Sequence, residues 1–192
     1  MSDPGAKLYC PSCGEQVETF IMLDESGESH HCFICGVKLD GGSGRSVKSL
    51  EMMLIAEDSM VFREVLTDKI LELGLAGEVE TANDGEEFIA LFTRRLVRGQ
   101  PVSLAVMDIR MPGMNGVNAA MAMRAIERGM ERKRLVPILF FSSVRCDDTL
   151  RDVFKHCAPA RYINKGNAAS PEELSERLVE VINGLLAESG KK

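Results

Sequence analysis

The six cysteines of this 192-residue sequence are unevenly placed, and four of them form two Cys-x-x-Cys segments. The segments are Cys10-Pro11-Ser12-Cys13 and Cys32-Phe33-Ile34-Cys35, which are separated by 18 residues and are each followed by glycine. Such a turn presents two thiolates, and the glycine lets backbone amides approach the sulfurs. The spacing predicts a closed tetrahedral zinc site with four ligands: Cys10, Cys13, Cys32 and Cys35.

Disulfides or free thiols are the alternative interpretation of these four cysteines, and His30 or His31 is an alternative ligand. A disulfide scaffold spreads its cysteines along the chain, whereas these four lie within residues 10–35. Metal binding is therefore favoured. The two distant cysteines, Cys146 and Cys157, are expected to be ordinary thiols.

A second set of reactive side chains comes directly after short apolar runs of the sequence. If these runs are parallel strands, the groups that follow them meet at one edge of the sheet, where open α/β sheets bind their ligands. Three carboxylates, a hydroxyl and an ammonium then share one cleft. The groups are Glu57-Asp58, Asp108, Ser142 and Lys165.

This combination predicts phosphoryl chemistry. Crowded carboxylates repel one another, and a hard divalent cation such as Mg²⁺ relieves the repulsion. With Mg²⁺ on one side and Lys165 on the other, Asp108 can attack a phosphoryl donor, while Ser142 bonds a phosphoryl oxygen. Each residue alone would be interpreted as a cap or a solvated charge, so the prediction depends on their convergence.

The apolar runs alternate with longer amphipathic stretches, which predicts a doubly wound α/β fold with helices on both faces of a parallel sheet. The second run alternates polar and apolar residues, which suits an edge strand. The first helix is expected after Ser59, and the last after Ser170. The five runs are residues 52–56, 78–82, 104–107, 138–141 and 161–164.

The glycine-rich stretch 40–44 indicates a hinge between two units. We expect a metal-binding unit over residues 1–40, a flexible linker over 41–48 and an α/β domain over 49–188. A hydrophobic content of 45% is enough for one ordinary core in the larger unit.

The net charge of −6 argues against general attraction to nucleic acid or anionic lipid. Up to Gly44, two basic residues stand against seven acidic ones, which favours a protein partner for this segment. The sequence lacks a run of the ~20 apolar residues that a membrane-spanning helix needs, and it lacks a signal-peptide pattern. We therefore expect a cytoplasmic protein without membrane insertion.

Residues 49–187 resemble the receiver domains of two-component response regulators. The segment from Val106 to Gly116 is similar to the phosphoacceptor loop of that family. The acidic pair Glu57-Asp58, the turn at 83–85, Ser142 and Lys165 follow in the family's order and spacing. The resemblance implies a flavodoxin-like sheet with strand order 2-1-3-4-5.

The resemblance also implies roles for single residues. A histidine kinase or phosphotransfer protein would phosphorylate Asp108, with Mg²⁺ held by Asp58, Asp108 and the backbone carbonyl of Arg110, and by Glu57 through water. Ser142 and Tyr162 would be the switch residues that reshape the face formed by the fourth helix, fifth strand and fifth helix. One departure is Gly166, which stands where the family has proline after the lysine, so that Lys165 would be held less firmly.

The N-terminal segment resembles a zinc ribbon, which implies a small β-hairpin structure that binds protein or nucleic acid or only stabilises the chain. The leading hypothesis is a signalling switch without enzymatic activity on other molecules, whose output passes through its own surface or the ribbon to an unknown protein. The alternative is a transcription regulator whose ribbon binds nucleic acid under phosphorylation control. An aspartate-dependent phosphatase would need a second aspartate where Arg110 stands, and a pseudo-receiver would lack one of the site residues, none of which is missing.

Overall fold

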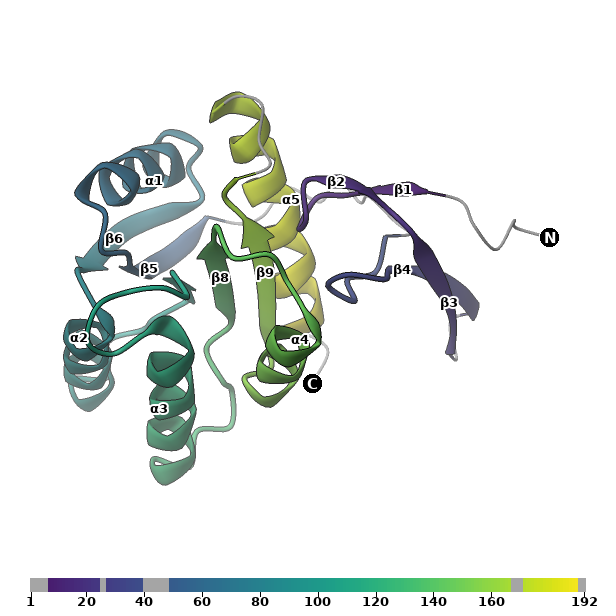
Figure 1. The fold of residues 1–192 in the computed structure, drawn as a ribbon. Helices are drawn as coiled ribbons and strands as arrows, with labels where there is room; N and C mark the ends of the chain where they lie inside the picture. Colours follow the sequence, from purple (N-terminus) through teal and green to yellow (C-terminus); the bar gives the residue numbers. More distant parts are fainter. Residues whose placement is uncertain (1–6, 25–26, 40–48, 167–170, 190–192) are drawn as a thin grey trace.

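The computed structural model describes residues 7–24, 27–39, 49–166 and 171–189. Its centre is a five-stranded sheet in the order β6-β5-β7-β8-β9 (Figure 1), and every neighbouring pair is parallel. The predicted parallel sheet with flanking helices is confirmed, and β6 lies at an edge as expected. The strands are β5 (Leu50–Ala56), β6 (Ala76–Ala82), β7 (Leu104–Met107), β8 (Ile138–Ser142) and β9 (Ala160–Asn164).

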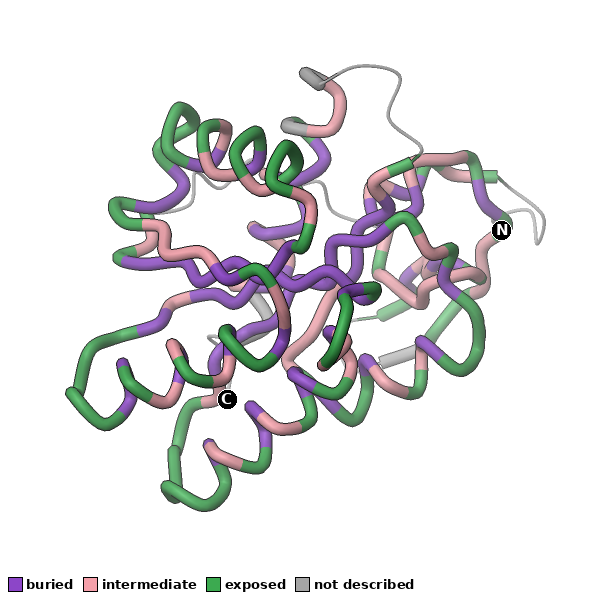
Figure 2. Tube along the Cα trace, turned by 60° about the vertical axis from the view of Figure 1, so that its left-hand side comes forward, coloured by how far each residue is buried: buried purple, intermediate pink, exposed green. Residues whose placement is uncertain are grey.

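Helices cover both faces of the sheet because successive residues of a strand point to opposite faces. On β5, Met52 and Leu54 face the core under α2, α3 and α4, whereas Met53 and Ile55 face the core under α1 and α5. Figure 2 shows the buried trace along the strands and the exposed outer turns of the helices. The helices are α1 (Met60–Glu72), α2 (Gly85–Val97), α3 (Gly116–Gly129), α4 (Asp148–His156) and α5 (Pro171–Ser189).

The first helix begins as predicted, because the Ser59 side chain accepts a hydrogen bond from the Phe62 amide. Only a narrow stripe of this helix is buried. Leu66 and Ile70 are buried, but Phe62 and Val65 are exposed, since a helix on one face of a sheet buries only a narrow stripe. Ser170 and the linker 41–48 lie outside the described residues.

The N-terminal residues 7–24 and 27–39, here called the cysteine ribbon, form two antiparallel hairpins. Its small core consists of Cys10, Cys13, Val17 and Cys32. In Figure 1 the ribbon lies beside β9 and α5. Among the described helices, none is both long and apolar enough to cross a bilayer. The ribbon strands are β1 (Leu8–Cys10), β2 (Glu15–Val17), β3 (Thr19–Asp24) and β4 (Gly27–Cys32).

Candidate functional site

The strand ends bring the predicted acids and the lysine together in one place, here called the carboxylate site. The Lys165 ammonium lies 2.8 Å from Oδ2 of Asp108 and 2.5 Å from Oε2 of Glu57. Carboxylate oxygens of Glu57, Asp58 and Asp108 all lie within 4.8 Å of one another. Glu57 and Asp58 follow β5, Asp108 follows β7 and Lys165 follows β9. The parallel arrangement of these three strands therefore creates the site.

In the carboxylate site, burial and the neighbouring lysine shift the pKa of Glu57 in opposite directions. Glu57 is only 2% exposed and Asp108 only 7%, whereas Asp58 faces solvent. Burial raises the pKa of Glu57, the hydrogen bond from Lys165 lowers it, and the Asp108 charge raises it again. The ammonium also lies 5.2 Å from the ring centroids of both Phe62 and Phe141, so aromatic faces help to stabilise the cation.

The loop after Asp108 is fixed by backbone contacts. The Asp108 amide donates to the Ala56 carbonyl at 2.9 Å, and the Arg110 amide donates to Oδ1 of Asp108 at 3.2 Å. Gly116 begins α3 so close to this loop that a Cβ there would lie 1.9 Å from the Asp108 carbonyl oxygen. Glycine at this position therefore lets the loop and the helix approach each other.

A shallow opening leads from solvent to the exposed acid. It is a cavity of about 640 Å³ bordered by Asp58, the loop after Asp108 and the start of α3. The opening leads to Asp58 and to the loop that follows Asp108. The lining residues are Asp58, Ile109, Arg110, Met111, Pro112, Asn115 and Val117.

The two predicted switch residues are linked through Val144. Ser142 is buried, and its Oγ accepts a hydrogen bond from the Val144 amide at 3.4 Å. Tyr162 is also buried; its hydroxyl donates to the Val144 carbonyl at 2.5 Å and accepts from Nδ2 of Asn164 at 2.7 Å. Its ring stacks on Phe154 at a centroid distance of 5.7 Å.

The loop that carries Lys165 is held by hydrogen bonds. The Lys165 amide donates to the Ser142 carbonyl at 3.0 Å, and the Gly166 amide donates to Oδ1 of Asn164 at 2.7 Å. The bond between Lys165 and Gly166 is not among the cis peptide bonds of the described residues.

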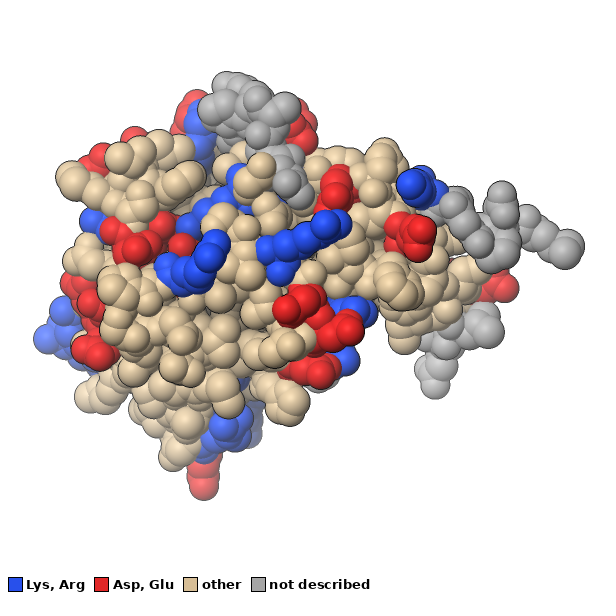
Figure 3. Space-filling view, viewed as in Figure 1, with Lys and Arg blue, Asp and Glu red and all other residues tan. Residues whose placement is uncertain are grey.

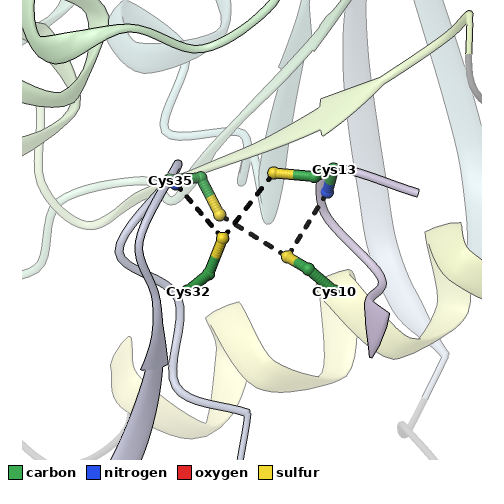
Figure 4. Close-up of side chains that lie close together, drawn as sticks. All are labelled: Cys10, Cys13, Cys32 and Cys35. Atoms are coloured by element: carbon green, nitrogen blue, oxygen red, sulfur yellow. Dashed lines mark hydrogen bonds between the residues drawn. The ribbon is translucent and has the colours of Figure 1, made fainter. Parts of the chain in front are cut away.

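The four ribbon cysteines form one cluster, with all four sulfurs turned toward one another (Figure 4). The Sγ atoms of Cys10 and Cys35 lie 3.7 Å apart, and those of Cys13 and Cys32 lie 3.8 Å apart. Zinc–sulfur bonds of about 2.3 Å give a tetrahedral site with sulfurs about 3.8 Å apart, so the cluster has the right size for the ion. All four are free thiols rather than disulfides.

Hydrogen bonds from backbone amides to the cysteine sulfurs also fit a metal cluster. The Cys13 amide donates to the sulfur of Cys10, and the Cys35 amide donates to that of Cys32, which is the way knuckle turns stabilise thiolates. His31 lies outside the cluster, with its ring nitrogens near the Ser29 hydroxyl and the Gly36 carbonyl.

Two residues that sequence reasoning missed connect the ribbon to the sheet. Arg177 on α5 is 2% exposed and donates to the Pro11, Ser12 and Asn164 carbonyls. The Asn164 amide donates to the Ser12 carbonyl at 2.8 Å. The sequence offers one signal for Arg177. It is a cation that stands directly before Leu178, a residue of the apolar stripe of the last helix.

A doubly wound sheet with an aspartate, a lysine and two further acids at its strand ends defines the class of receiver-like α/β domains. A family model described as the response regulator receiver domain matches residues 53–178, which is more than half of the chain. The chain belongs to this family.

Two curated relatives match this chain over part of their own length. The chain is 29% identical over 130 residues to the transcriptional regulatory protein AruR of Pseudomonas aeruginosa, covering 68% of this chain and 48% of the relative. It is 30% identical over 84 residues to histidine kinase CKI1 of Arabidopsis thaliana, covering 40% of this chain and 7% of the relative. The chain thus spans less than half the length of both curated relatives.

A solved structure has the same fold. The receiver domain of CKI1 in complex with Mg²⁺ and BeF₃⁻ superposes with a TM-score of 0.58 at 22% sequence identity, covering 71% of this chain and 90% of that one.

Proposed function

We propose that the protein is a phosphorylation switch of two-component signalling in which Asp108 accepts a phosphoryl group. The observation that carries this proposal is the Lys165 ammonium, which lies between the carboxylates of Asp108 and Glu57. A buried cation beside a nucleophilic carboxylate stabilises the charge of an incoming phosphoryl group.

The chemistry follows from these positions. A carboxylate oxygen of Asp108 forms the new bond to phosphorus while the bond from phosphorus to the donor's nitrogen or oxygen breaks. Lys165 then neutralises a phosphoryl oxygen, and Ser142 can bond another after leaving the Val144 amide. The acyl phosphate is hydrolysed or passed on, so the protein acts on itself rather than on a separate substrate.

The acids fit a magnesium ion. Oxygen atoms from three carboxylates lie within 4.8 Å of one another, and Mg²⁺ prefers such ligands with several waters. We assign Asp58, Asp108 and the Arg110 carbonyl as ligands, with Glu57 acting through water. The ion would supply the positive charge that an anionic donor needs to approach these acids.

The cysteine cluster fits a structural zinc ion held by Cys10, Cys13, Cys32 and Cys35. Sulfur separations of 3.7 and 3.8 Å match a tetrahedral thiolate site. The described ribbon has too small a core to be stable alone, since only four of its residues are buried apolar ones. Zinc therefore stabilises its fold.

The partners are proteins. On α1, next to Glu57-Asp58, apolar side chains of Met60, Val61 and Phe62 are 63%, 69% and 46% exposed, which suits docking of a histidine kinase or phosphotransfer protein in the cytoplasm. On the face in Figure 3, acidic and basic side chains of the described residues are interspersed, without a continuous basic surface on the ribbon. Nucleic-acid binding by the ribbon is therefore the second candidate.

Phosphorylation is tested by mass spectrometry of the full chain with Mg²⁺ and acetyl phosphate. We expect one phosphoryl adduct on wild type and none on Asp108→Asn. Asp68→Asn is the matched control because Asp68 is an exposed aspartate on α1. An adduct on Asp108→Asn, or none on folded wild type, would contradict the proposed function.

Zinc is tested by metal analysis of purified protein. We expect about one zinc per chain in wild type and in Cys157→Ser, and strong loss in Cys32→Ser. Equal zinc in all three proteins would show that the cluster is not the site.

A further inference from the structure

The first knuckle of the cysteine ribbon is joined to the sheet by one buried arginine. Arg177 donates from Nε to the Pro11 carbonyl at 2.8 Å, and from Nη2 to the carbonyls of Ser12 at 3.3 Å and Asn164 at 3.1 Å. The Asn164 amide donates to the Ser12 carbonyl. The peptide group before Asn164 is therefore bonded to the ribbon, and the peptide group after Asn164 is bonded to Arg177.

Asn164 is the residue before Lys165, so this contact reaches the carboxylate site through one peptide bond. The Lys165 amide and ammonium bind Ser142 and Asp108, respectively. Gly166 follows where the receiver family has proline, and glycine leaves the backbone more freedom than proline does. The loop thus depends on other contacts to fix its lysine.

We propose that Arg177 and the loop Pro11–Gly14 form a clamp that positions Lys165, and that the metal-loaded ribbon is thereby coupled to the phosphoacceptor site. Arg177 is a positioning residue, because it acts through Asn164 and Lys165 and does not touch Asp108. This inference rests on the proposed function of Asp108.

The clamp sits within a broader contact. The Tyr9 hydroxyl donates to Glu173 at 3.2 Å, Arg145 pairs with Glu15 at 3.1 Å, and Ile34 and Cys35 pack against the core that contains Tyr162. The Arg145 side chain is 70% exposed, so its pair with Glu15 adds little. Buried Arg177 and the Asn164 amide together hold the first knuckle against the sheet.

Coupling between two sites is reciprocal. If the metal-loaded ribbon strengthens binding of a phosphoryl mimic at Asp108, the mimic strengthens metal binding at the cysteines by the same factor. The clamp therefore predicts two effects of equal size at two separate sites.

Two glycines offer a matched pair of variants. Gly14 and Gly36 each follow a Cys-x-x-Cys segment with φ of +72° and +78°. A Cβ on Gly14 would lie 2.5 Å from Cζ of Arg177, whereas a Cβ on Gly36 meets nothing within 4 Å. Gly14→Ala and Gly36→Ala thus bring the same backbone strain, but only the first displaces Arg177.

The experiment uses the full chain with saturating zinc and measures beryllofluoride affinity in Mg²⁺ by calorimetry. We expect Gly14→Ala and Arg177→Ala to bind beryllofluoride about tenfold more weakly than wild type, with partial recovery in Arg177→Lys. Gly36→Ala and Arg145→Ala should bind it like wild type. Mg²⁺ affinity without beryllofluoride should be unchanged in Gly36→Ala and Arg145→Ala, and it should not fall in Gly14→Ala or Arg177→Ala, since only a general loss of structure would weaken it.

Zinc competition with a chromophoric chelator gives the reciprocal measurement. Beryllofluoride should tighten zinc binding about tenfold in wild type and leave it unchanged in Gly14→Ala. Equal beryllofluoride affinity in Gly14→Ala, Gly36→Ala and wild type would overturn the clamp while leaving the proposed function intact. Failure of wild type to bind beryllofluoride at all would overturn both.

Discussion

The ammonium of Lys165 lies 2.5 Å from Oε2 of Glu57, and both side chains are almost fully buried. Lys165 is therefore bonded to the acids where a metal is expected to bind. Two cations near the same carboxylates repel each other, so lysine and metal compete for the charge of Glu57 and Asp108.

Removal of this lysine should separate metal binding from phosphoryl binding. We expect Lys165→Ala to bind Mg²⁺ about tenfold more tightly, a gain of about 1.4 kcal/mol, and to lose the beryllofluoride adduct. Calorimetric titration with each ligand measures both effects. Lys155→Ala, at an exposed lysine of α4, is the control, and unchanged Mg²⁺ affinity in Lys165→Ala would contradict the competition.

Gly116 should tolerate no side chain. Its Cβ would meet the Asp108 carbonyl oxygen at 1.9 Å, so Gly116→Ala must push the loop after Asp108 away from α3. We expect a loss of about 2–4 kcal/mol in unfolding free energy by urea titration. Gly129→Ala, near the end of the same helix, meets nothing within 4 Å and should change stability by less than about 1 kcal/mol.

The buried ion pair of Arg124 and Glu127 should be costly to break. Arg124 is 2% exposed and Glu127 fully buried, and Glu127 also accepts from the Val136 amide at 2.6 Å. Glu127→Ala leaves the buried Arg124 cation without its counter-ion and the Val136 amide without its acceptor, which costs about 3–5 kcal/mol of unfolding free energy. Asp152→Ala breaks an exposed pair of the same spacing, and its urea midpoint should stay at the wild-type value.

Cys146 should resist alkylation. Burial raises the pKa of its thiol from 9.0 to about 12, so near pH 8 its thiolate fraction is about a thousandfold below that of an ordinary cysteine. Peptide mapping after iodoacetamide treatment of folded and urea-unfolded protein should show labelling of Cys146 only when unfolded. Rapid labelling in the folded protein would contradict the burial.

The raised pKa of Cys146 also affects the stability of the fold at alkaline pH. Between pH 9.0 and about 12 the unfolded thiol loses its proton while the folded thiol keeps it. The folded state then binds more protons, so the free energy of unfolding falls as pH rises through this window. The fall should be smaller in Cys146→Ala.

The sheet and the composition of the carboxylate site could be predicted because local sequence determines both. Five short apolar runs predict parallel strands, and the residue after each run must lie at the carboxyl edge. Asp108 and Lys165 are therefore brought together by topology alone, although 57 positions separate them.

The contact between ribbon and sheet could not be predicted in this way. Arg177 and Pro11 are separated by 166 positions, and neither belongs to a periodic pattern that requires the other. A glycine-rich stretch between the units predicts that they can move relative to each other, and it gives no information about which of their surfaces meet.

The hydrogen bond from the Asn164 amide to the Ser12 carbonyl also bears on self-association. It closes part of the open side of β9, the last strand of the sheet. Unpaired amides on an outer strand are a template for pairing with another chain. If the proposed zinc ion holds the ribbon in place, its removal would expose that template, and we expect aggregation through β9 even while the sheet itself remains folded.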